Sequence, residues 1–169
     1  MARITVLVGP PGSGKSTFAV DYARKHPCPP NCTIISQDSQ GREGHLKLFE
    51  SALSAGSDLI IDRMNFDKNQ RNRYLSSARK AGYDTRIIVF DVHRDTCIDR
   101  CNKRDDHPTI KEERTAKTAV DFYFLNFEQV MAEEADEIMR VGSSDFIRDF
   151  TGAFPNDLPS YPTGHRLED

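Results

Sequence analysis

The sequence predicts an α/β fold in which a parallel β-sheet is sandwiched between helices. Short apolar runs alternate with longer helical patterns along most of the chain, which is the order expected of repeated strand–helix units. Two of the runs, residues 6–8 and 87–90, are continuously apolar, and such strands are typical of a parallel sheet covered on both faces. Right-handed crossovers would then place helices over the sheet.

The same alternation predicts where the individual elements lie. We expect strands at Ile4–Val8, Thr33–Ile35, Asp58–Ile61, Thr85–Phe90 and Glu137–Val141. Helices are expected to begin near Lys15, Gly44, Asp67, Arg94 and Ile110. Asp67 is a suitable N-cap because its carboxylate can accept a hydrogen bond from a free N–H group of the first turn, and Ala81-Gly82 is a typical helix end.

The length and charge of the chain fit one soluble domain. The 169 residues include 23 Lys and Arg against 26 Asp and Glu, and this balance argues against non-specific coating of duplex DNA, which relies on a basic surface. No run approaches the roughly 20 apolar residues of a membrane-spanning helix, and the first residues show no signal-peptide cleavage site. The sequence predicts a cytoplasmic protein with no membrane partner, a domain over residues 1–150, and a Pro- and Gly-rich tail over residues 151–169.

Four cysteines occur as two pairs with three residues between the members of each pair. Cys28 with Cys32, and Cys97 with Cys101, have spacings that invite comparison with zinc sites. The second pair falls in a predicted helix, where positions four apart share a face. Free thiols that are buried or half-buried are therefore the favoured interpretation, and we assign no metal–thiolate site.

A phosphate-binding loop follows the first predicted strand. Residues 9–16, Gly-Pro-Pro-Gly-Ser-Gly-Lys-Ser, match the P-loop pattern. The glycines allow backbone N–H groups to turn toward a phosphate, and the following helix adds its positive dipole end. The lysine of this motif reaches the β- and γ-phosphates, and its serine hydroxyl ligates Mg²⁺. We therefore predict that ATP, or another nucleoside triphosphate, binds with Mg²⁺ at Gly9, Gly12, Ser13, Gly14, Lys15, Ser16 and Thr17.

Two acidic residues follow other predicted strands. The carboxyl ends of parallel strands meet at one edge of a sheet, so Asp38 and Asp62 are expected near the γ-phosphate. Asp38 is the candidate general base that orients a hydroxyl acceptor and takes its proton. Asp62 ends an apolar strand and is the candidate Mg²⁺ ligand, or else it orients Asp38, Arg42 or the acceptor. Asn65 either bonds the acceptor or caps the next helix.

A predicted helix after the fourth strand carries two arginines. Arg100 and Arg104 lie four residues apart, on one helical face, before a segment broken by Pro108. Kinases with a P-loop place a helical lid at this point, and its arginines meet phosphate charge in the transition state. A solvated basic face is the alternative, and the neighbouring Asp105 and Asp106 favour it.

Together these motifs resemble the 5′-polynucleotide kinase family of bacteriophage and bacterial end-healing enzymes. The resemblance covers roughly residues 3–141 and rests on the P-loop, on Ser36-Gln37-Asp38, and on residues 61–65 and 100–104. It implies a P-loop kinase-type sheet between helices, with a helical lid.

The resemblance also implies roles for individual residues. By it, Asp38 corresponds to the general base, Lys15 and Ser16 to the ligands of phosphate and Mg²⁺, and Arg104 to the lid arginine. The chain departs from the family pattern in two places. Arg42 lies one residue later than the family's arginine, and Asn65 lies one residue later than the family's asparagine.

The leading hypothesis is ATP-dependent phosphorylation of the 5′-hydroxyl ends of RNA or DNA, beside separate ligase or phosphatase proteins. An acceptor strand needs cations for its phosphates, and Arg63 and Lys68 contribute to a basic stretch near the two acidic residues. The predicted substrate-binding residues are Arg42, Asp62, Asn65, Arg71 and Arg73. A kinase of a small hydroxyl compound and a nucleotide-binding module without transfer activity are the alternatives, and a solvated helix face is the alternative for the arginines.

Overall fold

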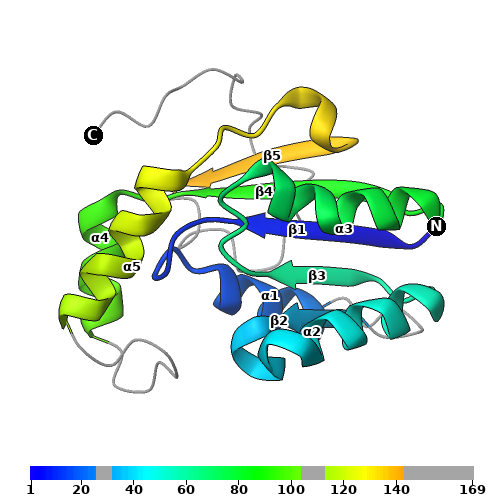
Figure 1. The fold of residues 1–169 in the computed structure, drawn as a ribbon, viewed down its shortest axis with the longest axis horizontal. Helices are drawn as coiled ribbons and strands as arrows, with labels where there is room; N and C mark the ends of the chain where they lie inside the picture. The colour runs from blue at the N-terminus through cyan, green and yellow to red at the C-terminus, as the bar shows by residue number, and fades with distance from the viewer. Residues whose placement is uncertain (26–31, 104–112, 143–169) are drawn as a thin grey trace.

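A parallel sheet of five strands forms the centre of the protein. The computed structural model describes residues 1–25, 32–103 and 113–142. The strands within these ranges are β1 (Arg3–Val8), β2 (Thr33–Ser36), β3 (Leu59–Asp62), β4 (Asp84–Asp91) and β5 (Glu137–Gly142). Their order across the sheet is β2-β3-β1-β4-β5, and every pairing is parallel (Figure 1). The predicted fold class is therefore confirmed.

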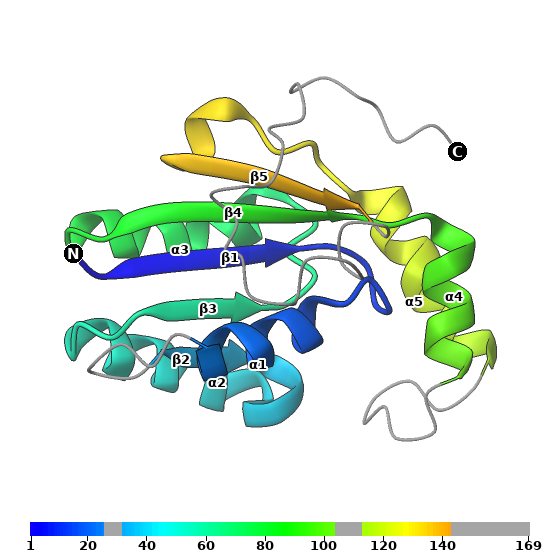
Figure 2. The ribbon, with the colours of Figure 1, turned by 180° about the vertical axis from the view of Figure 1, so that it is seen from behind.

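Helices cover both faces of this sheet and one of its ends. They are α1 (Lys15–Lys25), α2 (Gln37–Ser54), α3 (Lys68–Lys80), α4 (Arg94–Asn102), α5 (Glu113–Asn126) and the 3-10 helix η1 (Ala132–Glu134). Figures 1 and 2 show α2 and α3 on one face and α1 on the other, while α4 and α5 lie side by side beyond the carboxyl ends of the strands. The helix pair α4–α5 thus covers the edge at which the P-loop was predicted.

The central strand β1 is buried on both faces. Val6 and Val8 belong to a core with Phe49 of α2 and Tyr74 of α3, whereas Leu7 belongs to a second core that includes Phe18 and Ala19 of α1. Alternate residues of a strand point to opposite faces, so the continuously apolar sequence of β1 supplies both cores. The strand that leads into the P-loop is therefore held from two sides.

Helix α2 differs from its prediction. It begins at Gln37, whereas the sequence predicted a start near Gly44. Gly41 interrupts it with φ 75° and ψ 174°, a conformation that only glycine adopts readily. The side chain of Gln40 accepts a hydrogen bond from the Ser36 N–H at 2.7 Å and donates to a β2 carbonyl at 3.2 Å. These bonds hold one helical turn against β2. They stabilise an early helix start for which the local sequence has only a weak preference.

The predicted boundaries of α3 are confirmed. Asp67 is the N-cap, and its carboxylate accepts a hydrogen bond from the Gln70 N–H at 2.7 Å. The helix ends before Gly82, whose φ is 80°. The predicted start of the last helix near Ile110 and the predicted tail over residues 151–169 lie outside the described residues. Within the described ranges, no helix is both long enough and apolar enough to cross a membrane.

Candidate active site

The P-loop joins β1 to α1 and is anchored to the neighbouring strand. Gly9 donates its N–H to the Met64 carbonyl at 3.1 Å, just beyond the end of β3. Within the loop, the Ser13 hydroxyl donates to the Pro10 carbonyl at 2.7 Å. Gly12 and Gly14 have positive φ of 79° and 100°, which is the backbone freedom that the motif predicted.

Helix α4 packs directly on this loop. A Cβ atom at Gly12 would lie 2.4 Å from the Cys97 carbonyl oxygen and 2.9 Å from the Cys101 Sγ. Arg100 donates from Nη1 to the Gly12 carbonyl at 3.4 Å. Gly12 is thus required by the space under α4 as well as by its φ, and the sequence revealed only the second reason. Cys97 and Cys101 are buried on α4 and are not in a disulfide, so the predicted burial of this pair is confirmed.

Lys15 lies in the loop with only 8% of its surface exposed. Its ammonium group donates to the Pro10 carbonyl at 2.8 Å and to the Ser13 hydroxyl at 3.4 Å. Burial lowers the pKa of Lys15 to about 8, although the negative charges of Asp62 and Asp38 raise it in part. The group is thus mostly charged at pH 7, and it is held where the motif places phosphate oxygens.

Ser16 and Asp62 meet although 46 residues separate them in the sequence. The Ser16 hydroxyl donates to the Asp62 Oδ2 at 2.7 Å, and Asp62 is the half-buried last residue of β3. Burial and the charge of Asp38 raise the pKa of Asp62, while Lys15 and the Ser16 hydrogen bond lower it. An oxygen pair of this kind fits Mg²⁺, which prefers carboxylate and other oxygen ligands.

Asp38 lies at the same edge of the sheet, in the separate first turn of α2. It is exposed, and its charge acts on both Lys15 and Asp62. The fold therefore brings together the two acidic residues and the P-loop lysine. Arg42 follows the kink at Gly41 and is also exposed. An exposed carboxylate beside the P-loop can reach a hydroxyl acceptor.

Asn65 is buried and directed at neighbouring backbone carbonyls, where an acceptor cannot reach it. Its side chain is fully buried, and its Nδ2 donates to the Leu7 carbonyl at 2.7 Å and to the Arg63 carbonyl at 3.3 Å. Its φ is 49°, a conformation that asparagine tolerates better than most residues. Asn65 therefore fixes the turn between β3 and α3, and both of its predicted roles, acceptor contact and helix cap, are wrong.

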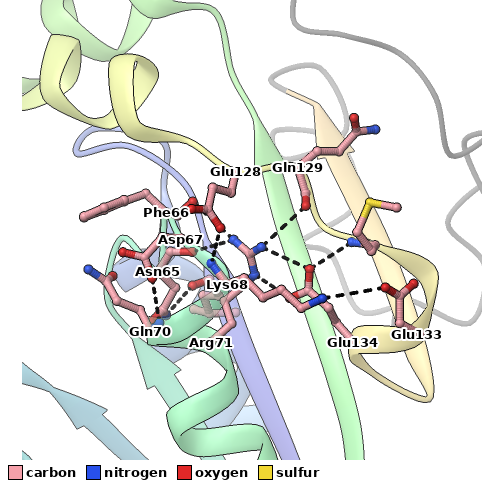
Figure 3. Close-up of polar contacts among 12 residues, drawn as sticks. Asn65, Phe66, Asp67, Lys68, Gln70, Arg71, Glu128, Gln129, Glu133 and Glu134 are labelled. Atoms are coloured by element: carbon pink, nitrogen blue, oxygen red, sulfur yellow. Dashed lines mark hydrogen bonds and ion pairs between the residues drawn. The ribbon is translucent and has the colours of Figure 1, made fainter.

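Arg71 is also wrongly predicted as a substrate ligand. It is 0% exposed and forms a two-point ion pair with Glu134, at 2.7 Å from Nε and 3.0 Å from Nη2 (Figure 3). Its Nη1 donates to the Asn65 and Phe66 carbonyls at 3.1 and 3.2 Å. The guanidinium therefore joins the β3–α3 connection to the segment before β5, and it is out of reach of a substrate.

The other predicted cations have mixed positions. Arg73 is exposed on α3. Arg63 is half-buried and donates to the Tyr74 hydroxyl at 2.9 Å, while Lys68 is exposed and lies 3.7 Å from the Glu133 carboxylate. Arg104 falls outside the described residues. No local pattern indicated Glu134 as the partner of Arg71, because 63 residues separate them.

A P-loop at the end of a central parallel strand, with a serine–aspartate pair beside it, defines a nucleotide-binding P-loop protein. The chain belongs to the AAA domain family, whose sequence profile matches residues 39–129. The matched segment begins directly after Asp38 and extends through α5 to the segment that precedes η1.

Two curated proteins are similar in sequence. Transcription factor bHLH140 of Arabidopsis thaliana is 33% identical over 110 residues, which are 62% of this chain and 12% of that protein. A protein of Acanthamoeba polyphaga mimivirus, provisionally named a bifunctional polynucleotide phosphatase/kinase, is 30% identical over 134 residues, 78% of this chain and 31% of that protein. The matched region thus spans less than a third of the length of either protein.

Two solved structures share the fold. Chaetomium thermophilum Kti12, solved with ADP-AlF3, has a TM-score of 0.60 at 16% identity and covers 84% of this chain and 90% of its own. A candidate kinase of Chloroflexus aurantiacus has a TM-score of 0.63 at 14% identity, with 94% and 92% covered. At these identities the likeness shows the fold alone, and that fold is of the P-loop kinase type.

Removal of Arg71 should be costly to the folded state. Arg71→Met leaves the Glu134 carboxylate buried without its partner, and we expect the free energy of unfolding to fall by about 3–5 kcal/mol. Urea denaturation measures this change. Arg73→Met, two residues away on the exposed side of α3, is the matched control and should change stability by less than about 0.5 kcal/mol. Equal losses in the two variants would contradict the structural assignment of Arg71.

Nucleotide binding should take up protons at alkaline pH. With a pKa of about 8, Lys15 is largely neutral at pH 8.5, and the negative charge of a bound triphosphate raises that pKa again. Calorimetric titration with ATP at pH 8.5, in two buffers of different ionisation enthalpy, should therefore report proton uptake that nearly disappears at pH 7. Lys15→Met should show none, and uptake that persists in this variant would locate the titrating group elsewhere.

Proposed function

We propose that this protein is an ATP-dependent kinase that transfers the γ-phosphoryl group to the 5′-hydroxyl end of RNA or DNA. One observation carries the proposal. The exposed Asp38 follows β2 by two residues, and the last residue of β2, Ser36, pairs with Asp62 in the sheet, so Asp38 lies at the edge where the P-loop opens. A P-loop that only binds nucleotide has no need of an additional exposed carboxylate at this place, whereas transfer to a hydroxyl uses one as general base.

The chemistry assigned to the site is a single displacement. The Asp38 carboxylate accepts the proton of the 5′-hydroxyl, and the hydroxyl oxygen forms a bond to the γ-phosphorus. The bond from that phosphorus to the β–γ bridging oxygen breaks, its electron pair stays on that oxygen, and ADP leaves. Lys15 stabilises the charge on the phosphates, while Arg100, already at Gly12, and Arg104 are assigned to the transferring group.

Mg²⁺ fits the oxygen atoms of Ser16 and Asp62. Ser16 and Asp62 would hold the ion beside the nucleotide, and its charge would offset that of the phosphates. The chain's own contribution is to hold the hydroxyl and the carboxylate together at 2.7 Å and to keep the carboxylate half-buried. The charge of a bound cation favours the ionised form of Asp62, against the effect of burial.

A polynucleotide acceptor is supported by the mimivirus relative, whose name joins polynucleotide phosphatase and kinase. It is also supported by the resemblance of Ser36-Gln37-Asp38 and residues 61–65 to the 5′-polynucleotide kinases. Arg42 and Arg73 are exposed and are assigned to the phosphates of the acceptor strand. Separate ligase or phosphatase proteins are the partners that such an activity implies.

The proposed activity is tested by label transfer. The protein is incubated with γ-labelled ATP, Mg²⁺ and a 5′-hydroxyl oligonucleotide, and in parallel with a panel of nucleosides and small hydroxyl compounds. The proposal expects label on the oligonucleotide alone, at its 5′ end. Label on a small compound alone would show that the acceptor is a small molecule and not a polynucleotide. Binding of ATP without transfer to any acceptor would show that the protein is a nucleotide-binding module.

Loss of the Asp38 carboxylate should slow transfer without weakening nucleotide binding. Asp38→Asn keeps the size of the side chain but cannot accept the proton, so we expect kcat to fall by roughly 100-fold or more while the Kd for ATP stays unchanged. Asp84→Asn removes the same charge at the amino end of β4 and serves as the control, with kcat near that of the parent. If Asp38→Asn instead loses affinity for ATP and keeps its turnover, Asp38 is a ligand of the nucleotide and not the general base.

A further inference from the structure

The helical turn that carries Asp38 is bonded to an edge strand by a single side chain. β2 is an outermost strand of the sheet, and an edge strand presents backbone groups that no further strand pairs. The Gln40 amide bonds two of them: its oxygen accepts from the Ser36 N–H at 2.7 Å, and its nitrogen donates to the Ile34 carbonyl at 3.2 Å. One residue of a further parallel strand would make the same pair of bonds. Gln40 therefore holds the turn against the sheet as a neighbouring strand would.

A second contact holds the other end of this turn, at the kink of α2. Gly41 leaves the helical conformation, with φ 75° and ψ 174°, so the backbone changes direction directly after Gln40. His45 is 2% exposed, and its Nδ1 lies 2.9 Å from the Gly41 carbonyl oxygen. Because a carbonyl only accepts hydrogen bonds, Nδ1 carries the proton. The Nε2 atom of the ring has no hydrogen-bond partner among the described residues, so the polar contact of His45 there is with the kink.

These two contacts determine where the backbone of Asp38 lies. The pairing of Ser36 with Asp62 places the end of β2 beside the end of β3, and Asp38 follows two residues later. Ser36 is the N-cap of α2, but its side chain makes no capping hydrogen bond. The Asp38 side chain itself is exposed. Its position relative to the P-loop thus depends on the backbone, which Gln40 holds at β2 and His45 holds at the kink.

We propose that Gln40 and His45 are positioning residues for Asp38, the general base of the proposed reaction. The inference rests on the proposed function and names the residues that place its base. A general base must lie within about 2.6–3.2 Å of the group whose proton it accepts, and a misplacement of about 1 Å can cost about 100-fold in rate. Neither residue is assigned to the reacting atoms. Each acts through the backbone on either side of Asp38.

The alternative is that both contacts only stabilise α2. His45 shares the buried face of this helix with Phe49 and Ala52, so its ring also belongs to the packed interior. A purely structural role predicts that activity falls with the stability of the variant and is independent of Asp38. A positioning role predicts a loss of turnover that requires the Asp38 carboxylate to be present. The two roles therefore differ in a measurable way.

The first test combines Gln40→Met with Asp38→Asn. Methionine keeps the length of glutamine but forms neither bond to β2. With kcat measured at saturating ATP and 5′-hydroxyl oligonucleotide, Gln40→Met should lower it about 10- to 100-fold and leave the Kd for ATP unchanged. In the Asp38→Asn background the same change should lower kcat by no more than about twofold, because the base that it displaces is already absent. Gln70→Met, at a half-buried position of α3, is the matched control and should leave kcat near that of its background.

The second test compares His45→Asn with His45→Leu. Asparagine keeps a nitrogen donor close to the position of Nδ1, whereas leucine fills the buried space but cannot donate to the Gly41 carbonyl. A buried polar atom without a partner is costly, so urea denaturation should show that leucine gives the more stable protein. Asparagine should nevertheless give the higher kcat per folded molecule. The order of the two variants in turnover should thus be opposite to their order in stability.

Each outcome supports or overturns the proposal. If Gln40→Met lowers kcat by the same factor with and without the Asp38 carboxylate, or if turnover follows stability in the His45 variants, the positioning role is overturned while the kinase proposal stands. If Asp38→Asn transfers phosphate at the parent rate, the base assignment fails, and the positioning role fails with it. If the parent protein phosphorylates no oligonucleotide, the proposed function itself fails, together with the roles assigned to Gln40 and His45.

Discussion

The rest of the site depends on how the P-loop is seated between two rigid neighbours. On one side, Gly9 is bonded to the Met64 carbonyl just beyond β3. On the other, the backbone of α4 approaches Gly12 so closely that no Cβ atom fits. Because β1 is buried on both faces, the loop cannot relax by tilting its strand. Its donors are therefore positioned by the fold before any phosphate arrives, which is the condition for electrostatic stabilisation of a transferring group.

The buried pair of Arg71 and Glu134 holds the β3–α3 connection, next to the strand end that anchors the P-loop. Its hydrogen bonds tie the β3–α3 connection, which begins directly after Asp62, to the segment that follows α5. A pair of this kind is a weak source of net stability but is expensive to break, because one charge is then left buried. The connection between the end of β3 and the segment that follows α5 is thus held by an interaction that tolerates little change.

Much of the fold and of the phosphate site could be predicted from local sequence. The strands, the N-cap Asp67 and the P-loop residues follow from periodicity and from a motif whose spacing is fixed by backbone geometry. The roles of Asn65 and Arg71 could not be predicted, because a polar side chain in a loop or helix pattern looks the same whether it faces solvent or a buried partner. The early start of α2 was missed for a similar reason, since the contacts of Gln40 with β2 become visible only in the folded chain.

The central claim is that Asp38 and the P-loop address the two sides of one transferring phosphoryl group. A crystal structure with a non-hydrolysable ATP analogue, Mg²⁺ and a 5′-hydroxyl dinucleotide tests it most directly. The account predicts the triphosphate in the P-loop with Lys15 at its β- and γ-oxygens, and the 5′-hydroxyl within about 2.6–3.2 Å of the Asp38 carboxylate, in line with the γ-phosphorus. A dinucleotide bound with its hydroxyl turned away from Asp38, or a triphosphate bound outside the loop, would contradict it.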